Sequence, residues 1–115
     1  MNNLRQNSST QLVSGIRELI KGQEQALLEK LRPIVRRQSV RLDLSSTERI
    51  DAAGLAALVS LYRDARESGH DFAVVDPQRR VARVLKIVGL ERMIVPATPG
   101  EMLPQRAALN LELVA

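Results

Sequence analysis

Few residues of this 115-residue chain have the type and spacing that catalysis requires. The single histidine, His70, lies between Gly69 and Asp71, which is typical of a solvated turn residue rather than of a general base. Asp43 and Asp51 fall at a predicted strand end and a predicted helix start, where two carboxylates could approach each other. An N-cap role for Asp51 and a polar strand face for Asp43 explain these residues better. We therefore expect no acid–base catalysis.

The glycines, serines and cysteines exclude further classes of chemistry. The 6 glycines are scattered singly, so the chain has neither a Gly-x-Gly-x-x-Gly loop nor a Walker loop for phosphate. Ser60 falls inside a predicted helix, and no Gly-x-Ser-x-Gly elbow is present. The absence of cysteine removes disulfides, thiolate metal sites and cysteine nucleophiles, and it is typical of a reducing compartment. The sequence thus predicts a cytoplasmic, non-enzymatic protein without a cofactor or a metal.

One short turn has a more informative pattern. Ile50 is an apolar anchor, Asp51 is the expected N-cap, and a helix follows. We expect Gly54 to allow close approach of the backbone to a partner or to a neighbouring strand, and Leu55 to point back into the core. Because the exposed amides of a helix start attract anions, the turn is also a candidate site for a small ligand or a nucleotide.

Hydrophobic periodicity predicts that strands and helices alternate around this turn. Strands are expected at residues 11–16, 39–44, 71–76 and 93–96, and helices at about 18–35, at 53–66 and from Pro77 to Gly89. Asp76 is the expected N-cap of the last helix, whose apolar stripe consists of Val81, Val84, Leu85 and Val88. Alternating strands and helices imply right-handed crossovers and a mainly parallel sheet, so the expected class is α/β.

The two ends of the chain differ from this central pattern. We expect a flexible lead-in at residues 1–9, one domain at 10–98 and an extension at 99–115. The strict alternation of Leu109, Leu111 and Leu113 with polar residues predicts a strand. Because the N-terminus supplies little strand, this segment is expected to add to an exposed sheet edge, in its own molecule or in a neighbour's. The sequence leaves open whether the chain forms a homodimer.

The charge pattern suggests which partners to expect. The net charge of +4 comes mainly from arginines spread along the chain, and the exposed Arg79, Arg80 and Arg83 form either a solvated helix face or a contact for an acidic partner. With Tyr62 and Phe72 as the only aromatic residues, base stacking has little support, so no nucleic acid is expected. Nowhere do 18 apolar residues run uninterrupted, so we expect no direct membrane insertion.

Two segments together carry a family resemblance. The strand Val40–Leu44 followed by Ile50–Leu55 resembles the signature of STAS domains, in which an apolar strand ending in Asp-Leu precedes Asp-Ser-Ser-Gly-Leu. The similarity continues through the 72–76 strand, and Leu85–Leu90 looks like the Leu-x-x-x-Gly-Leu element of that family. The resemblance covers roughly residues 39–97. It implies a STAS-like mixed, mainly parallel central sheet with helices packed mostly on one face.

The resemblance also implies a switch that this sequence lacks. In regulatory members similar to this chain, the residue after the aspartate is a serine that a kinase-like anti-sigma factor phosphorylates to break their complex. Here that residue is Ala52, and Ala53 follows, so neither can accept a phosphate. Either the protein is locked in the unmodified state, or the turn has become purely structural. Ser45, Ser46 and Thr47 are alternative phosphosites, although loop solvation explains them more simply.

The expected function follows from the same resemblance. Anti-sigma factor antagonists bind an anti-sigma factor through this turn, which maps the expected contact onto Asp51, Ala52, Ala53 and Gly54. An alternative is a soluble STAS subunit of a lipid- or anion-transport complex, because similar domains attach to such transporters. A scaffolding role of that kind does not need the missing serine.

Overall fold

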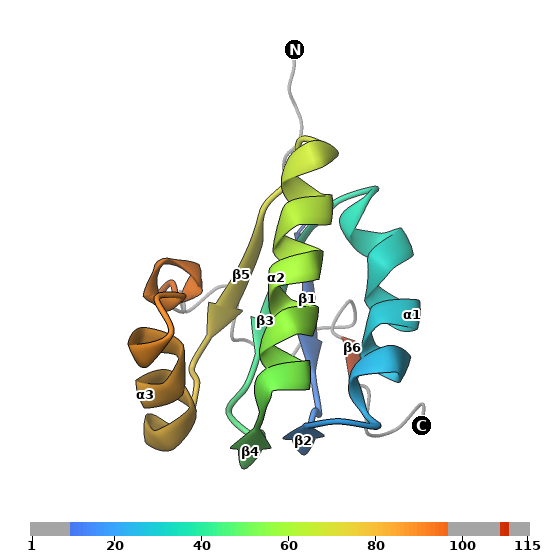
Figure 1. The fold of residues 1–115 in the computed structure, drawn as a ribbon. Coiled ribbons are helices and arrows are strands. Elements are labelled where there is room, and N and C mark those ends of the chain that lie inside the picture. The colour runs from blue at the N-terminus through green and yellow to red at the C-terminus, as the bar shows by residue number, and fades with distance from the viewer. Residues whose placement is uncertain (1–9, 97–108, 111–115) are drawn as a thin grey trace.

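Parallel strands form the centre of the fold, which a computed structural model describes for residues 10–96 and for the backbone of 109–110. Four strands lie in the order β5-β3-β1-β6, and each pairing in this sheet is parallel (Figure 1). They are β1 (Thr10–Ser14), β3 (Ser39–Asp43), β5 (Phe72–Val75) and β6 (Leu109–Asn110). A second, two-stranded parallel sheet pairs β2 (Glu18–Leu19) with β4 (Arg49–Ile50). The predicted α/β class is confirmed.

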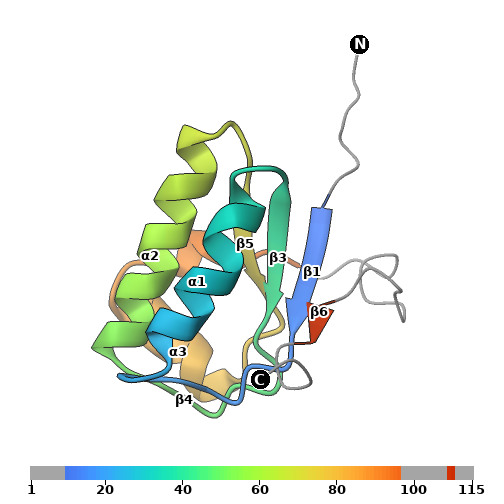
Figure 2. The same cartoon turned by 90° about the vertical axis from the view of Figure 1, so that its right-hand side faces the viewer.

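Three α-helices lie on the same side of the central sheet (Figure 2). They are α1 (Glu24–Val35), α2 (Ala52–Glu67) and α3 (Arg79–Ile87), and a short 3-10 helix, η2 (Glu91–Met93), follows α3. The placement of the helices on one face agrees with the expectation. Within the described part of the chain, no helix is both long enough and apolar enough to cross a membrane.

The core lies between the sheet and these helices. Val40, Leu42 and Leu44 alternate along β3, and all three are buried, as the alternation predicts. Their partners are aliphatic residues of β1, α1, α2, β5 and α3, among them Val13, Leu31, Leu61, Val74 and Leu85. Phe72 is the single aromatic residue in this buried cluster. Aliphatic packing of a sheet against one layer of helices is therefore what holds the domain together.

The first helix begins later than its periodicity predicts. Glu18 and Leu19 form β2 instead, and Leu19 pairs with Ile50 of β4. Gly22 then adopts a φ of +98°, which a right-handed helix cannot accommodate, and α1 begins at Glu24. The prediction of a helix from residue 18 was wrong because Leu19 is buried by pairing with a distant strand. Pro33 lies inside the last turn, and α1 ends at Val35.

Three predictions around α3 also need correction. Asp76 is not the N-cap, because its φ is +54° and Gln78 precedes the first helical residue. Val88 is 48% exposed, so it lies outside the core stripe. The strand predicted at 93–96 is replaced by η2, and Ile94 makes only an isolated parallel bridge with Val74.

The predicted C-terminal strand adds to the edge of its own sheet. In β6, Leu109 pairs with Val13 and Asn110 with Ser14. However, β1 is itself a five-residue strand that pairs with β3 from Thr10 to Val13, so the tail extends the sheet and does not replace a missing N-terminal strand. Residues 1–9, the rest of the 99–115 extension and the predicted strand beyond Asn110 lie outside the described residues.

Candidate partner-binding site

Asp51 joins the start of α2 to the segment that precedes α1. Its Oδ1 accepts a hydrogen bond from the backbone N–H of Gly54 at 3.1 Å, the expected N-cap bond. Its Oδ2 accepts a second bond from the N–H of Lys21 at 3.0 Å. The bond from Lys21, followed by the bond from Gly54, lowers the pKa of the Asp51 carboxyl below its ordinary value. Asp51 therefore holds the turn in place as a carboxylate.

Gly54 is needed where α2 passes over β2. A Cβ atom at this position would lie 2.0 Å from the carbonyl oxygen of Leu19 and 2.8 Å from its Cγ. Gly54 is buried, so its close approach is to the neighbouring strand. Of the two explanations for this glycine, the structure supports close approach to a neighbouring strand. Gly54 allows the start of α2 to pack directly on β2.

The other residues of the turn remain accessible. Asp51 and Ala52 are exposed, and Ala53 is half-buried. Ala52 is the first helical residue of α2, so the position that carries serine in the STAS signature lies on the surface. The turn therefore offers a small uncharged methyl group beside a carboxylate.

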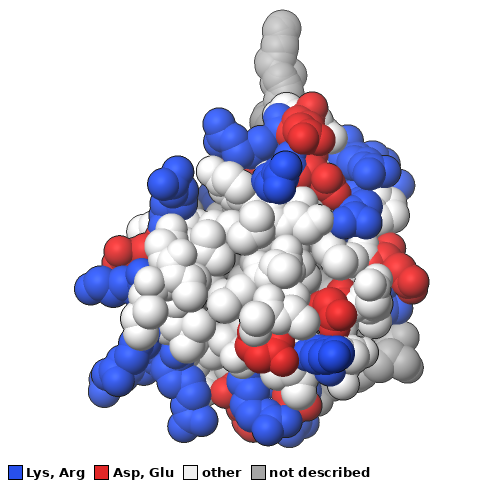
Figure 3. Space-filling model, viewed as in Figure 1, with Lys and Arg blue, Asp and Glu red and all other residues white. Residues whose placement is uncertain are grey.

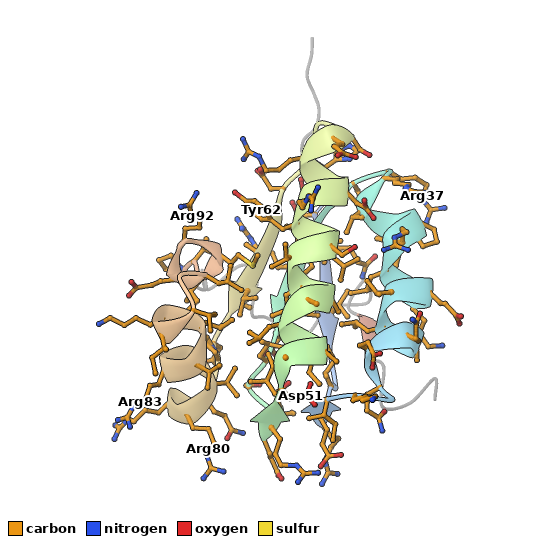
Figure 4. The ribbon with its side chains drawn as sticks, viewed as in Figure 1. Arg37, Asp51, Tyr62, Arg80, Arg83 and Arg92 are labelled. Atoms are coloured by element: carbon orange, nitrogen blue, oxygen red, sulfur yellow. The ribbon has the colours of Figure 1, made fainter. Side chains whose placement is uncertain are left out.

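An uncharged surface extends from this turn over α2 and towards α3 (Figure 3). On α2, half-buried Leu55, Val59 and Tyr62 pack against the core with one side only. Figure 4 shows Tyr62 on the edge of α2 that faces α3. The opposite edge of α2 is joined to α1, because Arg32 bonds Asp64 at 2.7 Å and Ser60 at 2.8 Å.

The α3 side of this surface contains the most exposed large apolar residues of the described chain. Ile87 is 74% exposed and Val88 is 48% exposed. Val84 is half-buried one turn before Val88. We call Ala52, Leu55, Val59, Tyr62, Val84, Ile87 and Val88 the apolar surface. Hydrophobic periodicity did not indicate this surface, because it placed Val84 and Val88 in the core and gave Ile87 no role.

The three predicted arginines lie on α3 around this surface. Arg79, Arg80 and Arg83 are exposed, and within the described residues none of them has an ion-pair partner. Figure 4 shows Arg80 at the same end of the molecule as Asp51, whereas Arg83 points away from α2. The structure thus brings the turn and Arg80 to one end of the domain and places Arg83 farther round α3.

Two side chains that were expected to be solvated are bonded instead. Thr47 is fully buried, and its Oγ1 donates a hydrogen bond to the carbonyl oxygen of Ile16 at 2.6 Å. Loop solvation is therefore the wrong explanation for Thr47, although Ser45 and Ser46 are exposed. His70 is half-buried, and its Nδ1 lies 3.0 Å from the carbonyl oxygen of Val35. No group of three or more potential metal ligands gathers among the residues described.

Comparison with known sequences identifies relatives of the central domain. Residues 6–96 match the sequence profile of a family described as "Mlab, STAS domain". A Thermotoga neapolitana protein, provisionally named an anti-sigma factor antagonist and TM1081 homologue, is 38% identical over 55 residues, which are 48% of this chain and 49% of that protein. An anti-sigma factor antagonist, also provisionally named, from Thermotoga maritima is 38% identical over 53 residues, 46% of this chain and 47% of its own. The chain spans about half the length of these curated relatives.

Solved structures share the fold at low sequence identity. The anti-sigma factor antagonist SpoIIAA in its unphosphorylated form is 15% identical, with a TM-score of 0.69 over 84% of this chain and 88% of its own. The T. maritima protein TM1081 is 23% identical, with a TM-score of 0.66 over 78% of this chain and 82% of its own. The murine anion transporter Slc26a9 is 14% identical, with a TM-score of 0.68 over 86% of this chain but 18% of the transporter.

The sequence profile and the fold lead to the same assignment. The profile covers most of the chain, including the Asp51 turn, the parallel strands β1, β3 and β5, and all three helices. The SpoIIAA structure superposes on a similar share of the chain. This protein therefore belongs to the STAS domain family.

Proposed function

We propose that this chain is a non-enzymatic protein-interaction module that binds an anti-sigma factor, or a related kinase-like regulatory protein, and so regulates sigma-dependent transcription. The observation that carries the proposal is the uncharged surface that extends from the Asp51 turn over α2 towards α3 (Figure 3), where Ile87 and Val88 are exposed. Members of the anti-sigma factor antagonist family generally have no enzymatic activity, which agrees with this role.

The apolar surface has the properties of a docking site. Ile87 and Val88 are exposed on α3. Burying them against a partner would stabilise the complex by roughly 25 cal/mol per Å² of apolar area removed from water. Contiguous apolar surface on a folded domain commonly marks an interaction site. The same surface could form a homodimer, which light scattering of the purified chain distinguishes from a monomer.

The arginines of α3 supply the rim of this proposed interface. Arg79, Arg80 and Arg83 are exposed on α3, and Arg80 lies at the end of the molecule that holds Asp51, so a partner with carboxylates around an apolar centre fits best. Charges at such a rim act mainly on the association rate and on its salt dependence. Binding is therefore expected to slow as the ionic strength rises.

Ala52 defines how the interaction is regulated. A phosphate at this position would add about −1.5 to −2 charges at the helix start and would disrupt an uncharged interface. Because Ala52 and Ala53 have no hydroxyl, binding is proposed to be continuous and controlled by the abundance of the partner.

The test is calorimetric titration with the candidate kinase-like anti-sigma factor from the same genome. We expect Ala52→Asp and Ile87→Asp each to weaken binding by about tenfold or more, because each places a charge inside an apolar contact. Gln25→Asp is the matched control, since Gln25 is exposed on α1, away from this surface. Unchanged affinity in both test variants, with a wild type that binds, would place the interface elsewhere.

A transport-complex subunit is the second candidate function. One observation favours it: the fold occurs within the anion transporter Slc26a9. Co-purification of the native protein with a membrane ATPase, and adjacent genes for transport components, would support this candidate. Recovery of a kinase-like anti-sigma factor would support the first.

A further inference from the structure

A cavity of about 480 Å³ opens between the β1–β2 connection and the first half of α1. One wall is the continuous segment 15–19, and Glu48 contributes to the rim. The opposite wall is formed by Gln23, the residue before α1, and by Ala26, Leu27 and Lys30 of α1. The cavity thus lies on the α1 side of the domain, away from the apolar surface on α2 and α3.

The cavity combines an apolar floor with a charged rim. Ile16, Leu19 and Leu27 line it and are almost fully buried in the core cluster. Its volume falls in the range of about 300–1,000 Å³ that is usual for small-molecule sites, which are mostly apolar with a few polar groups. A ligand for this cavity therefore needs an apolar body.

Hydrogen bonds from the 47–49 segment hold the strand-side wall open. The Oγ1 of Thr47 donates to the carbonyl oxygen of Ile16 at 2.6 Å. The N–H of Glu48 donates to the carbonyl oxygen of Arg17 at 2.9 Å. Arg49 pairs with the carboxylate of Glu18 at 2.8 Å. A wall held by three such contacts is preformed, so a ligand would not have to order it.

The rim charges favour an anionic head group at one end. Glu18 is already neutralised by Arg49. Lys30 is exposed, and within the described part of the chain its amine has no hydrogen-bond or ion-pair partner. The carboxylate of Glu48 lines a different part of the rim and would repel an anion from there. Arg17 also lines the cavity, and it already takes part in an interaction within the protein. A carboxylate head is thus directed to Lys30.

We propose that this cavity binds a single-chain amphiphile with a carboxylate head, such as a medium-chain fatty acid. Its alkyl chain lies along the floor that Ile16 and Leu27 form above fully buried Leu19, and its head group lies at Lys30. Burial of the alkyl chain supplies most of the affinity. The site is independent of the proposed partner interface, because it uses no residue of the Asp51 turn, α2 or α3.

The experiment is a titration of the full-length, isotope-labelled chain with decanoate, below its micelle concentration, followed by backbone amide NMR. We expect saturable shifts at residues 15–19 and 26–30, with weaker binding of decanol and weaker still of decyltrimethylammonium. Shifts that are absent, that centre on other residues or that do not depend on the head group would overturn the proposal.

Two variants and one control complete the test. Ala26→Trp fills the cavity from an exposed helix position and should abolish binding. Gln25→Trp places the same side chain on the adjacent exposed position, which does not line the cavity, and should bind like the wild type. Lys30→Gln should weaken the binding of decanoate by about threefold and leave the binding of decanol unchanged.

Three outcomes would count against the site. Equal binding by Ala26→Trp and wild type would overturn it. Equal loss in Ala26→Trp and Gln25→Trp would do the same, since filling the cavity would then not be the cause. Binding only by a chain shortened after Asn110 would assign the cavity to the chain's own tail, because β6 ends beside Ser14, next to the cavity wall at Gly15.

Discussion

The carbonyl oxygen of Leu19 occupies the place where a side chain at Gly54 would begin. A Cβ built on Gly54 lies 2.0 Å from that oxygen, far inside any permitted contact. The pair fixes how closely the start of α2 passes over β2, and Asp51 donates its own N–H to the same carbonyl oxygen at 3.2 Å. The candidate partner-binding turn is thus positioned by a strand that lies more than 30 residues earlier in the sequence.

Gly54→Ala tests this close approach. The added methyl group would push α2 away from β2, and overpacking of this kind costs about 3 kcal/mol in the free energy of unfolding. Urea denaturation measures the change. Ala56→Gly, at an exposed position of the same helix, should cost only about 1 kcal/mol, as expected from helix propensity alone. A Gly54→Ala protein as stable as wild type would show that β2 can move.

Asp51 makes stability depend on pH in one direction. Its folded-state pKa lies below the ordinary value of 3.8, so the carboxylate bonds to Lys21 and Gly54 stabilise the protein above that pH. This contribution is lost as the pH falls through the lower, folded-state pKa. We expect Asp51→Asn to be less stable than wild type at neutral pH and the difference to shrink below about pH 3.8. Denaturation across pH checks this, and a constant difference would contradict it.

Thr47→Val removes one hydrogen bond from a fully buried site at nearly constant volume. The carbonyl oxygen of Ile16 would lose its 2.6 Å partner, and an unsatisfied buried acceptor costs about 1–3 kcal/mol. Thermal unfolding should therefore occur at a lower temperature. Ser46→Ala, one residue earlier and exposed, should change stability by less than about 0.5 kcal/mol. Equal stability of both variants would mean that water replaces the lost hydroxyl.

Ala52→Ser would restore the hydroxyl that the STAS signature carries. Because residue 52 is exposed at the start of α2, a kinase-like partner that still recognises this surface should phosphorylate the serine. Mass spectrometry after incubation with that partner and ATP detects the modification, and the phosphorylated form should bind the partner at least about tenfold more weakly. The wild type is the control. A partner that binds Ala52→Ser tightly without modifying it would show that kinase recognition has been lost.

Local sequence patterns predicted an element correctly where the apolar residues of that element form its buried face. The alternation of Val40, Leu42 and Leu44 predicted β3, and all three residues are buried. The Asp51 N-cap followed from residue type and from its place before an apolar repeat. These features depend on contacts within a few residues, which the sequence displays directly.

The errors occurred where burial depends on distant segments. Leu19 has the spacing of a helical residue, but its burial comes from pairing with Ile50 and from the passage of α2 over β2. Val88 continues the stripe of Val81 and Leu85, yet α3 ends at Ile87 and leaves Val88 at the surface. Periodicity shows that a residue can be buried, whereas the neighbouring element decides whether it is.

By itself, the sequence determined the order of the main strands and helices, the parallel α/β class and the unphosphorylatable turn at Ala52, because hydrophobic period, capping and residue type are local properties. Only the tertiary structure decided that Gly54 supports this turn against Leu19, that Ile87 and Val88 are exposed on α3, and that a cavity separates residues 15–19 from α1. Each of these depends on the distance between segments far apart in the chain, which is set by the packing of the whole core.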